Sequence, residues 1–222
     1  MRVLVCGGAG YIGSHTCVAL AARGHAVVIA DNFCNSAPAV LTRLERLIGR
    51  APDAHRVDVR DASALTALFA GQRFDAVIHF AALKAVGESC ERPLDYFDNN
   101  ISGTITLLRA MRAADVGQLV FSSSATVYGD PQSVPIDEDA PLSSTNPYAR
   151  TKLVMEQLIG DVCAADPGFQ AISLRYFNPV GAHPSGLIGE AQSGVPNNLM
   201  HHICQVVAGK RERLQIYGGD WP

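Results

Sequence analysis

Short apolar runs alternate with longer amphipathic segments along residues 1–176. The apolar runs are nearly continuous, as in strands of a parallel sheet whose two faces are both covered by helices. The segments between them are long enough to form right-handed crossover helices. We predict strands at Val3–Cys6, Ala26–Ala30, His55–Val59, Ala76–Phe80, Gln118–Ser123 and Ala171–Arg175. This pattern is typical of an α/β fold built on a doubly wound parallel sheet.

The pattern changes after Tyr176. A helix is predicted at Leu199–Ala208 and a strand at Leu214–Tyr217, and no partner for that strand follows in the sequence. We therefore predict a first domain over residues 1–176 and a partial, truncated substrate-binding region over residues 177–222. Two loops rich in proline and polar residues, at Asp130–Pro147 and Asn178–Pro196, follow predicted strands. Open α/β sheets bind ligands at that edge, so a substrate cleft is expected there.

Composition narrows the classes of function. Hydrophobic residues make up 48% of the 222 residues and charged residues 18%, which argues against disorder. A net charge of −3 without a long basic run makes nucleic acid an unexpected partner. No apolar stretch approaches the ~20 residues of a membrane helix. The six cysteines form no C-x-x-C pair and the histidines no metal-binding pattern, so we expect no metal, reduced thiols and a cytoplasmic protein.

A glycine-rich segment directly follows the first predicted strand and opens a helix. Gly7 permits a tight turn, Gly10 lets backbone amides approach a pyrophosphate, and Gly13 permits close packing of the helix on the strand. A glycine triplet alone is weak evidence. Asp31, however, ends the second strand 18 residues after Gly13, where a carboxylate binds a ribose diol and repels a 2′-phosphate. The order of elements predicts a Rossmann domain that binds NAD rather than NADP.

A second set of residues has the chemistry of proton transfer. Tyr148 and Lys152 lie four residues apart on a predicted helix, hence on one face and one turn apart. A tyrosine has a pKa near 10, which a neighbouring ammonium lowers by favouring the phenolate. Ser124 follows the preceding strand and can donate to a sugar oxygen. Such a Tyr/Lys pair is usually a solvated helix face, but beside a dinucleotide site it predicts a Ser124–Tyr148–Lys152 catalytic triad.

The glycine spacing resembles that of the extended short-chain dehydrogenases. Two longer segments, Ser122–Asp130 and Arg175–Pro184, resemble the UDP-glucose 4-epimerase family within that group. Further segments that resemble this family are Val5–Thr16, Asp31–Asn32, His79–Ser89, Asp98–Asn100 and Pro196–Met200. The resemblance runs over nearly the whole chain. The family continues beyond the segment that resembles Gly218–Pro222, which implies that about a third of its length, including arginines that grip the diphosphate, lies outside this sequence.

The resemblance implies a cofactor site made of several groups of residues. The pyrophosphate is held by the glycine loop with Tyr11 and Ile12. The adenosine is contacted by Asp31, Asn32, Asn35, Ser36, Asp58 and Val59. The groove is lined by Phe80, Ala81, Lys84 and Asn99. Ser124, Tyr148, Lys152, Tyr176 and Phe177 surround the nicotinamide. The UDP-sugar is expected to contact Ser124, Tyr148, Asn178, Asn198 and Leu199.

The resemblance also implies a reaction, the reversible inversion of UDP-galactose and UDP-glucose at C4 through a 4-keto sugar. Tyr148 removes the proton of the 4-hydroxyl while a hydride passes to NAD, Ser124 holds the C4 oxygen, and Lys152 lowers the pKa of Tyr148. The implied class of enzyme is an isomerase of galactose metabolism. A homodimer is expected from the family. Around the triad, Ala149, Arg150 and Thr151 replace other small or basic residues of the family pattern.

Two alternatives stay open from the sequence. The first is a catalytically impaired NAD-binding remnant of the epimerase, because the arginines expected to grip the diphosphate are missing. The second is a sugar-nucleotide 4,6-dehydratase, which needs an acidic pair beside the hydroxyl at the strand end. Ser124, Ala125 and Thr126 supply no such pair, which disfavours the second.

Overall fold

The computed structural model describes residues 1–191, 199–216, 218 and 219. Its contacts divide the chain into two compact units, Met1–Ala191 and Gln192–Pro222. The first unit carries the sheet and is described below, while the described part of the second contains helix α8 (Leu199–Val207). The predicted domain boundary after Tyr176 concerns substrate binding and stays a prediction.

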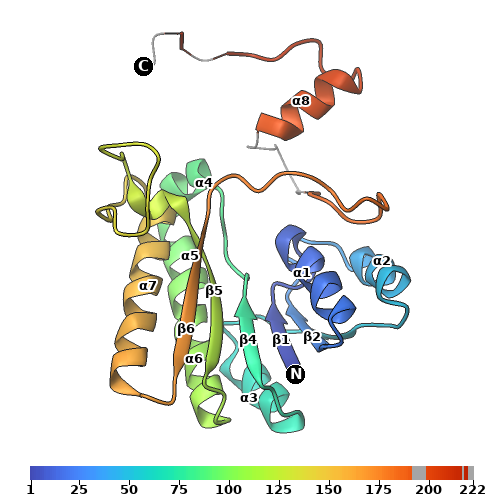
Figure 1. The fold of residues 1–222 in the computed structure, drawn as a ribbon, viewed down its shortest axis with the longest axis vertical. Helices are drawn as coiled ribbons and strands as arrows, with labels where there is room; N and C mark the ends of the chain where they lie inside the picture. The colour runs from blue at the N-terminus through green and yellow to red at the C-terminus, as the bar shows by residue number, and fades with distance from the viewer. Residues whose placement is uncertain (192–198, 217, 220–222) are drawn as a thin grey trace. The chain divides into compact units, whose positions relative to one another are not determined.

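The first unit contains a six-stranded sheet whose strands are all parallel, in the order β3-β2-β1-β4-β5-β6 (Figure 1). The strand bounds are β1 Arg2–Cys6, β2 Ala26–Asp31, β3 Asp53–Arg56, β4 Ala76–His79, β5 Gln118–Ser124 and β6 Gln170–Tyr176. The order reverses between β1 and β4. This is the switch point of a doubly wound sheet, where the loops after the two strands diverge and leave a crevice. The predicted fold class is confirmed.

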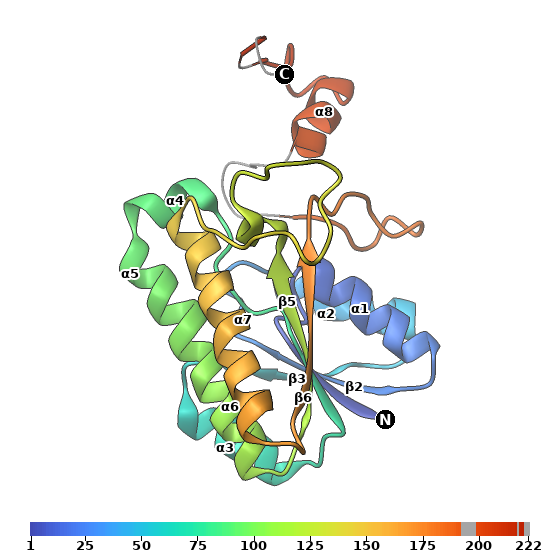
Figure 2. The ribbon, with the colours of Figure 1, turned by 60° about the vertical axis from the view of Figure 1, so that its left-hand side comes forward.

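Helices cover both faces of the sheet. The longer helices are α1 Tyr11–Ala22, α2 Ala39–Ile48, α3 Ala62–Gly71, α6 Gly103–Ala113 and α7 Pro147–Ala165. The shorter ones are α4 Val86–Glu91, α5 Pro93–Tyr96, the π-helix η1 Phe97–Ser102 and the 3-10 helix η2 Ala125–Tyr128. Figure 2 shows α1 and α2 on one face and α3, α6 and α7 on the other. None of the described helices is long and apolar enough to cross a membrane.

The core explains why β1, β2 and β4, at the centre of the sheet, are almost entirely apolar. Alternate residues of each strand point to opposite faces, so a strand covered on both faces needs apolar residues at every position. Leu4 and Val77 pack in the cluster beneath α3, α6 and α7, whereas Val5 and Ile29 pack beneath α1 and α2. The two clusters hold the sheet rigid, and its carboxyl edge positions the site.

The helix that carries two of the predicted catalytic residues has a strong start signal. The side chain of Asn146 accepts a hydrogen bond from the backbone N–H of Ala149 at 2.9 Å, and Pro147 occupies the first helical position. An asparagine cap satisfies an amide that has no partner inside the helix, and proline is pre-set for this position. Helix α7 therefore begins just before Tyr148, which places that residue in the first turn.

Two predicted strands differ from the structure. The third strand was predicted at His55–Val59 but ends at Arg56, because the chain turns at Asp58, whose carbonyl accepts a hydrogen bond from the Asp61 amide at 2.9 Å. The strand predicted at Leu214–Tyr217 is wrong for residues 214–216, which are not a strand, and Tyr217 lies outside the described residues. Strand propensity is realised only where a neighbouring strand completes the hydrogen-bond ladder.

Candidate active site

The glycine loop joins β1 to α1 at the switch point of the sheet. Gly7 has a φ of +77°, and a Cβ there would lie 2.7 Å from the backbone nitrogen of Ala81, which follows β4. A Cβ on Gly13 would overlap the carbonyl oxygen of Gly7. Only glycine fits these two positions. The glycine loop therefore has no side chains at these positions, and it leads directly into α1, with Gly10 at the N-cap. This arrangement suits the pyrophosphate of a dinucleotide.

Asp31 connects the glycine loop to the loop after β2. Its buried carboxylate accepts hydrogen bonds from the Ala9 amide at 2.9 Å, the Phe33 amide at 2.8 Å and the Ser36 hydroxyl at 3.1 Å. Asn35 lies in the same loop and is exposed. The carboxylate is thus held at the end of β2, beside the glycine loop. Contact between this acid and a ribose stays a prediction.

Asn32 and Asp58 meet at the ends of β2 and β3. The Asn32 amide donates to the Asp58 carboxylate at 3.0 Å, and Val59 next to it is buried. Arg60 also binds this carboxylate, through both its guanidinium and its backbone amide, and holds the pKa of Asp58 well below its usual range. Sequence reasoning missed Arg60. The signal was an arginine two residues after an acid in the turn that follows a strand.

The groove residues after β4 are fixed by the backbone and by side chains distant in sequence. The amides of Phe80 and Ala81 both donate to the carbonyl of Cys6, at 2.8 and 3.1 Å, which fastens this segment to the end of β1. Lys84 donates to Glu190 at 3.1 Å. Asn99 donates at 3.0 Å to a neighbouring asparagine side chain. The predicted groove residues therefore line the carboxyl edge of β4 and the facing π-helix.

That neighbouring asparagine is Asn100, a second residue that sequence reasoning missed. Its side chain accepts from the Leu83 amide at 2.8 Å and donates to the Leu83 carbonyl at 3.1 Å. The same amide lies 3.0 Å from the Thr151 hydroxyl. Asn100 therefore connects the segment after β4 to helix α7, one residue before Lys152.

The loop after β6 also reaches the glycine loop. The phenol of Tyr11 donates to the carbonyl of Gly181 at 2.7 Å, and burial is the main cause that raises the pKa of Tyr11. Ile12 beside it is half-buried. Asn178 lies in the same loop after β6 and is exposed. The segment expected to meet the substrate is thus joined to the segment expected to hold the cofactor.

The three predicted catalytic residues come together. Ser124 ends β5, Tyr148 lies in the first turn of α7, and Lys152 lies one turn further on, all three buried. The Ser124 hydroxyl accepts hydrogen bonds from the amide and the hydroxyl of Thr126, at 3.2 and 2.9 Å, and lies close enough to the Tyr148 phenol to lower its pKa. Lys152 donates to the carbonyl of Ser122 at 2.6 Å, and its ammonium lies 5.0 Å from the centroid of the Phe121 ring. A strand end and a helix start thus present a phenol, a hydroxyl and an ammonium together.

Burial controls the electrostatics of this cluster. It raises the pKa of Tyr148, and the nearby Ser124 hydroxyl opposes that effect. It lowers the pKa of Lys152 to about 7, against the raising effect of the carboxylate of Glu156. The expected lowering of the Tyr148 pKa by Lys152 is therefore not what the structure shows. The reason is that the ammonium donates to a backbone carbonyl and is itself desolvated, so burial dominates at both groups.

An ion pair supports the cluster from behind. Arg175 on β6 donates to the Glu156 carboxylate at 2.7 Å and to the Tyr128 phenol at 2.9 Å, with its guanidinium over the Tyr128 ring. Tyr128 in turn stacks on Phe177, with ring centroids 6.5 Å apart, and Phe177 is 60% exposed. Tyr176 is half-buried, which raises its pKa. The exposed face of Phe177 lies next to this supported cluster.

The two remaining residues predicted to contact the substrate are Asn198 and Leu199. Asn198 is outside the described residues, and Leu199 is the first residue of α8, in the second unit, with 66% of its surface exposed. Their contact with a substrate stays a prediction. Within the described parts of the chain, no three His, Cys, Asp or Glu side chains are grouped so that they could hold a metal ion.

Comparison with known proteins agrees with this geometry. The sequence profile of the NAD dependent epimerase/dehydratase family matches residues 3–220. The chain belongs to this family. Among curated relatives, a UDP-glucose 4-epimerase of Yersinia pestis is 56% identical over 223 residues, and one of Dictyostelium discoideum is 54% identical over 220 residues. These matches cover 100% and 99% of this chain but 66% and 64% of the relatives, so the chain spans about two thirds of their length.

Solved structures of the family give the same result. The UDP-glucose-4-epimerase of Stenotrophomonas maltophila, with bound NAD and formylated UDP-arabinopyranose, superposes with a TM-score of 0.97 at 54% identity, covering 100% of this chain and 66% of that one. The Bifidobacterium longum enzyme, in complex with NAD+ and UDP, superposes with a TM-score of 0.95 at 46% identity and the same coverage. The resemblance drawn from the sequence is confirmed at the level of family and fold.

Proposed function

We propose that the chain binds NAD and carries the catalytic centre of a UDP-glucose 4-epimerase, an isomerase that interconverts UDP-galactose and UDP-glucose. The observation that carries the proposal is the buried cluster of Ser124, Tyr148 and Lys152 at the carboxyl edge of the sheet, where strand β4 lies between β5 and the strand that leads into the glycine loop. A phenol beside a hydroxyl suits proton exchange with a sugar alcohol.

The cofactor would be held along the carboxyl edge. The bare backbone of Gly7, Gly10 and Gly13 would face the pyrophosphate, with Tyr11 and Ile12 beside it. The adenosine would contact Asp31, Asn32, Asn35, Ser36, Asp58 and Val59, and the rest of the groove would be lined by Phe80, Ala81, Lys84, Asn99 and Phe177. NAD, when bound, supplies a reversible hydride acceptor next to the sugar carbon.

Tyr148 performs the proton transfer. As the phenolate, its oxygen takes the proton of the sugar 4-hydroxyl in one direction, and the resulting phenol returns that proton in the other. Ser124 donates to the same sugar oxygen and keeps it at the phenol. A positive charge on Lys152 favours the phenolate, against the burial that raises the pKa of Tyr148. Burial of all three groups keeps bulk water from competing for the proton.

The setting of the enzyme follows from the same proposal. We place it in galactose metabolism in the cytoplasm, which fits six cysteines that are all free thiols in the structure. We also propose a homodimer, on the family resemblance alone. The UDP-sugar would contact Asn178, Asn198 and Leu199.

The test is turnover by the purified chain. UDP-galactose is added with NAD, and the UDP-glucose formed is measured with a coupled dehydrogenase. We expect Tyr148→Phe to lower the rate by roughly 10²–10⁴-fold. Tyr96→Phe is the matched control, because it also removes a buried phenol hydroxyl, one that donates to Glu88 at 2.7 Å and is not part of the triad. Equal rates for Tyr148→Phe and the wild type would contradict the proposal.

Thermal shift separates this proposal from the remnant alternative. A ligand that binds the folded state raises the melting temperature. NAD is expected to raise it under both readings, whereas UDP raises it only if the chain also holds the sugar nucleotide. Stabilisation by NAD alone, without turnover, would favour the remnant.

A further inference from the structure

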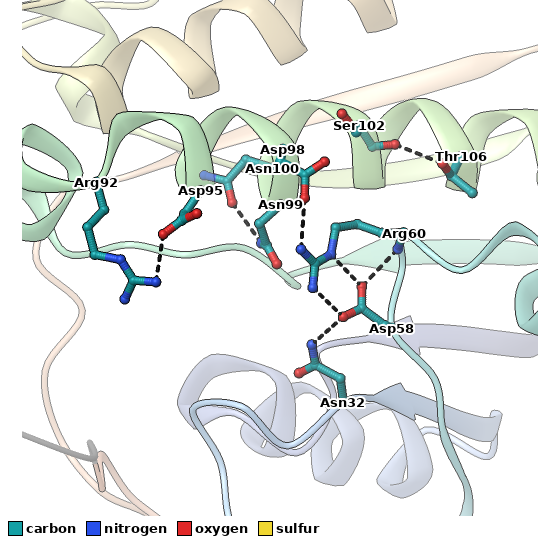
Figure 3. A network of polar contacts seen from close by, with 10 residues as sticks. All are labelled: Asn32, Asp58, Arg60, Arg92, Asp95, Asp98, Asn99, Asn100, Ser102 and Thr106. Atoms are coloured by element: carbon teal, nitrogen blue, oxygen red, sulfur yellow. Dashed lines mark hydrogen bonds and ion pairs between the residues drawn. The ribbon is translucent and has the colours of Figure 1, made fainter.

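Arg60 lies at the centre of a polar network at one end of the proposed cofactor site (Figure 3). It occupies the tight turn between β3 and α3, at the carboxyl edge of the sheet. Its guanidinium reaches Asp58 in the same turn and Asp98 on the π-helix η1. The network therefore joins two segments 38 residues apart in sequence.

Arg60 fixes the orientation of the Asp58 carboxylate. One carboxylate oxygen accepts hydrogen bonds from the Arg60 backbone amide at 2.9 Å and from its Nε at 3.0 Å. The other oxygen accepts hydrogen bonds from Nη2 of Arg60 at 2.8 Å and from the side-chain amide of Asn32 at 3.0 Å. A carboxylate has about four acceptor positions, and Arg60 fills three of them with donors from one rigid group and the adjoining backbone. Only the position held by the neutral Asn32 amide is open to exchange with a ligand donor.

Asp98 fixes Arg60 in turn. Its carboxylate accepts a hydrogen bond at 2.8 Å from Nη1, the remaining terminal nitrogen of Arg60. The planar guanidinium is therefore held by Asp58 and by Asp98. The stem of Arg60 passes over Gly103 at the start of α6, where a Cβ would lie 3.6 Å from its Cγ. Asp98 also precedes Asn99, which is expected to line the cofactor groove. The network thus sets the distance between the turn after β3 and the π-helix.

The position of the network suggests a ligand chemistry. Asn32 directly follows Asp31, the acid expected to bind the adenosine ribose, so Asp58 lies one hydrogen bond beyond the ribose site. A fixed carboxylate at that point accepts hydrogen bonds and offers none. Adenine presents an exocyclic amine, which donates, whereas hypoxanthine presents a carbonyl oxygen at the same place. A fixed acceptor therefore distinguishes the two bases.

We propose that Arg60 is a positioning residue that aligns the Asp58 carboxylate to accept the exocyclic amine of adenine, in exchange for the Asn32 amide. The inference rests on the proposed binding of NAD. An isolated exposed ion pair contributes little to stability. If Arg60 had only this structural role, its removal would leave base selectivity unchanged. Aligning an acceptor makes a different prediction. Without the guanidinium, only the backbone amide at position 60 and the Asn32 amide hold the carboxylate, so it can rotate and the preference for adenine is lost.

The experiment compares two dinucleotides on the intact chain. Dissociation constants for NAD and for nicotinamide hypoxanthine dinucleotide are measured by calorimetry for the wild type, Arg60→Met and Arg60→Lys. We expect the wild type to prefer NAD by roughly tenfold, the value of one hydrogen bond to a base edge. Both variants are expected to bring the ratio near one, because a lysine ammonium cannot hold both Asp58 oxygens and Asp98 together.

The matched control is Arg92→Met. Arg92 is also an exposed arginine with two acidic partners, Glu88 and Asp95, and it makes no contact with Asp58. This variant is expected to keep the wild-type ratio. If Arg60→Met does not fold, Arg60→Lys decides the question, because it retains the charge and most of the stem.

The outcomes separate the inference from the proposed function. A ratio unchanged from the wild type in Arg60→Met and Arg60→Lys overturns the inference and leaves NAD binding standing. A wild-type chain that binds both dinucleotides equally also overturns it. A wild-type chain that binds neither overturns both the inference and the proposed function.

Discussion

Replacing Lys152 by methionine is expected to stabilise the fold while it abolishes turnover. Lys152 is 4% exposed, and burial lowers its pKa from its ordinary value of 10.5 to about 7. Each unit of pKa corresponds to ~1.36 kcal/mol, so the charged side chain costs the folded state about 5 kcal/mol relative to the neutral one. Methionine has a similar length and carries no charge into the core.

The gain from Lys152→Met is smaller than that penalty. The substitution leaves the carbonyl of Ser122 without the donor that lies 2.6 Å away, which costs about 1–3 kcal/mol. The expected net stabilisation at pH 7 is about 2–4 kcal/mol. For a chain of this size that corresponds to a melting temperature higher by roughly 4–16 °C.

The pH dependence identifies the cause. Because the folded-state pKa of Lys152 lies below the unfolded value, the unfolded chain binds the extra proton between about pH 7 and pH 10.5. The free energy of unfolding of the wild type therefore rises as pH rises through that window. Below pH 7 the full cost of burying the charged Lys152 applies. The advantage of Lys152→Met is expected to shrink by about 2 kcal/mol between pH 7 and pH 9.

The assay is urea denaturation of both proteins at several pH values from 7 to 9, followed by circular dichroism. Titrations that the two proteins share cancel in the difference. Exchange of the exposed Lys210 for methionine is the control, and its stability difference from the wild type is expected to be small at every pH. A Lys152→Met chain less stable than the wild type at pH 7, or a difference that does not vary with pH, would refute the reasoning.

Two further substitutions test the packing around the site. Gly13→Ala puts a Cβ against the carbonyl oxygen of Gly7 and is expected to lower the free energy of unfolding by about 1–3 kcal/mol and to remove most of the affinity for NAD. The control is Gly160→Ala, which has open space around it and is expected to cost no stability. Urea denaturation measures the stability and calorimetry measures the affinity of both variants. Glu156→Gln leaves Arg175 without its charged partner in a pair whose side chains are 9% and 19% exposed, and is expected to cost about 3 kcal/mol. Exchanging both members for leucine and methionine should recover part of that loss in the same assay, and no recovery would count against burial as the cause.

The function of the site depends on the same burial that lowers its stability. A cluster that holds a phenol and an ammonium away from water loses hydration energy that the fold must offset elsewhere. The two hydrophobic clusters on either side of the sheet provide that offset. Variants that remove the desolvation cost at Lys152 are therefore expected to be more stable and less active.

Local patterns in the sequence determined the sheet, the glycine loop and the spacing of Tyr148 and Lys152 on one helix. Continuous apolar runs follow from burial on both faces, and four-residue spacing on a helix places Tyr148 beside Lys152 without knowledge of the rest of the fold. The glycines at 7 and 13 could be read in the same way, because their role depends on the backbone of a turn.

Only the tertiary structure decided the contacts between segments distant in sequence. The bonds from Arg60 to Asp98 and from Arg175 to Glu156 depend on which turns and helices meet, which no local periodicity encodes. The end of the third strand and the absence of a strand at residues 214–216 depended on neighbouring backbone. The direction of the Tyr148 pKa did so as well, because desolvation is set by everything packed around the phenol rather than by the one lysine nearby in sequence.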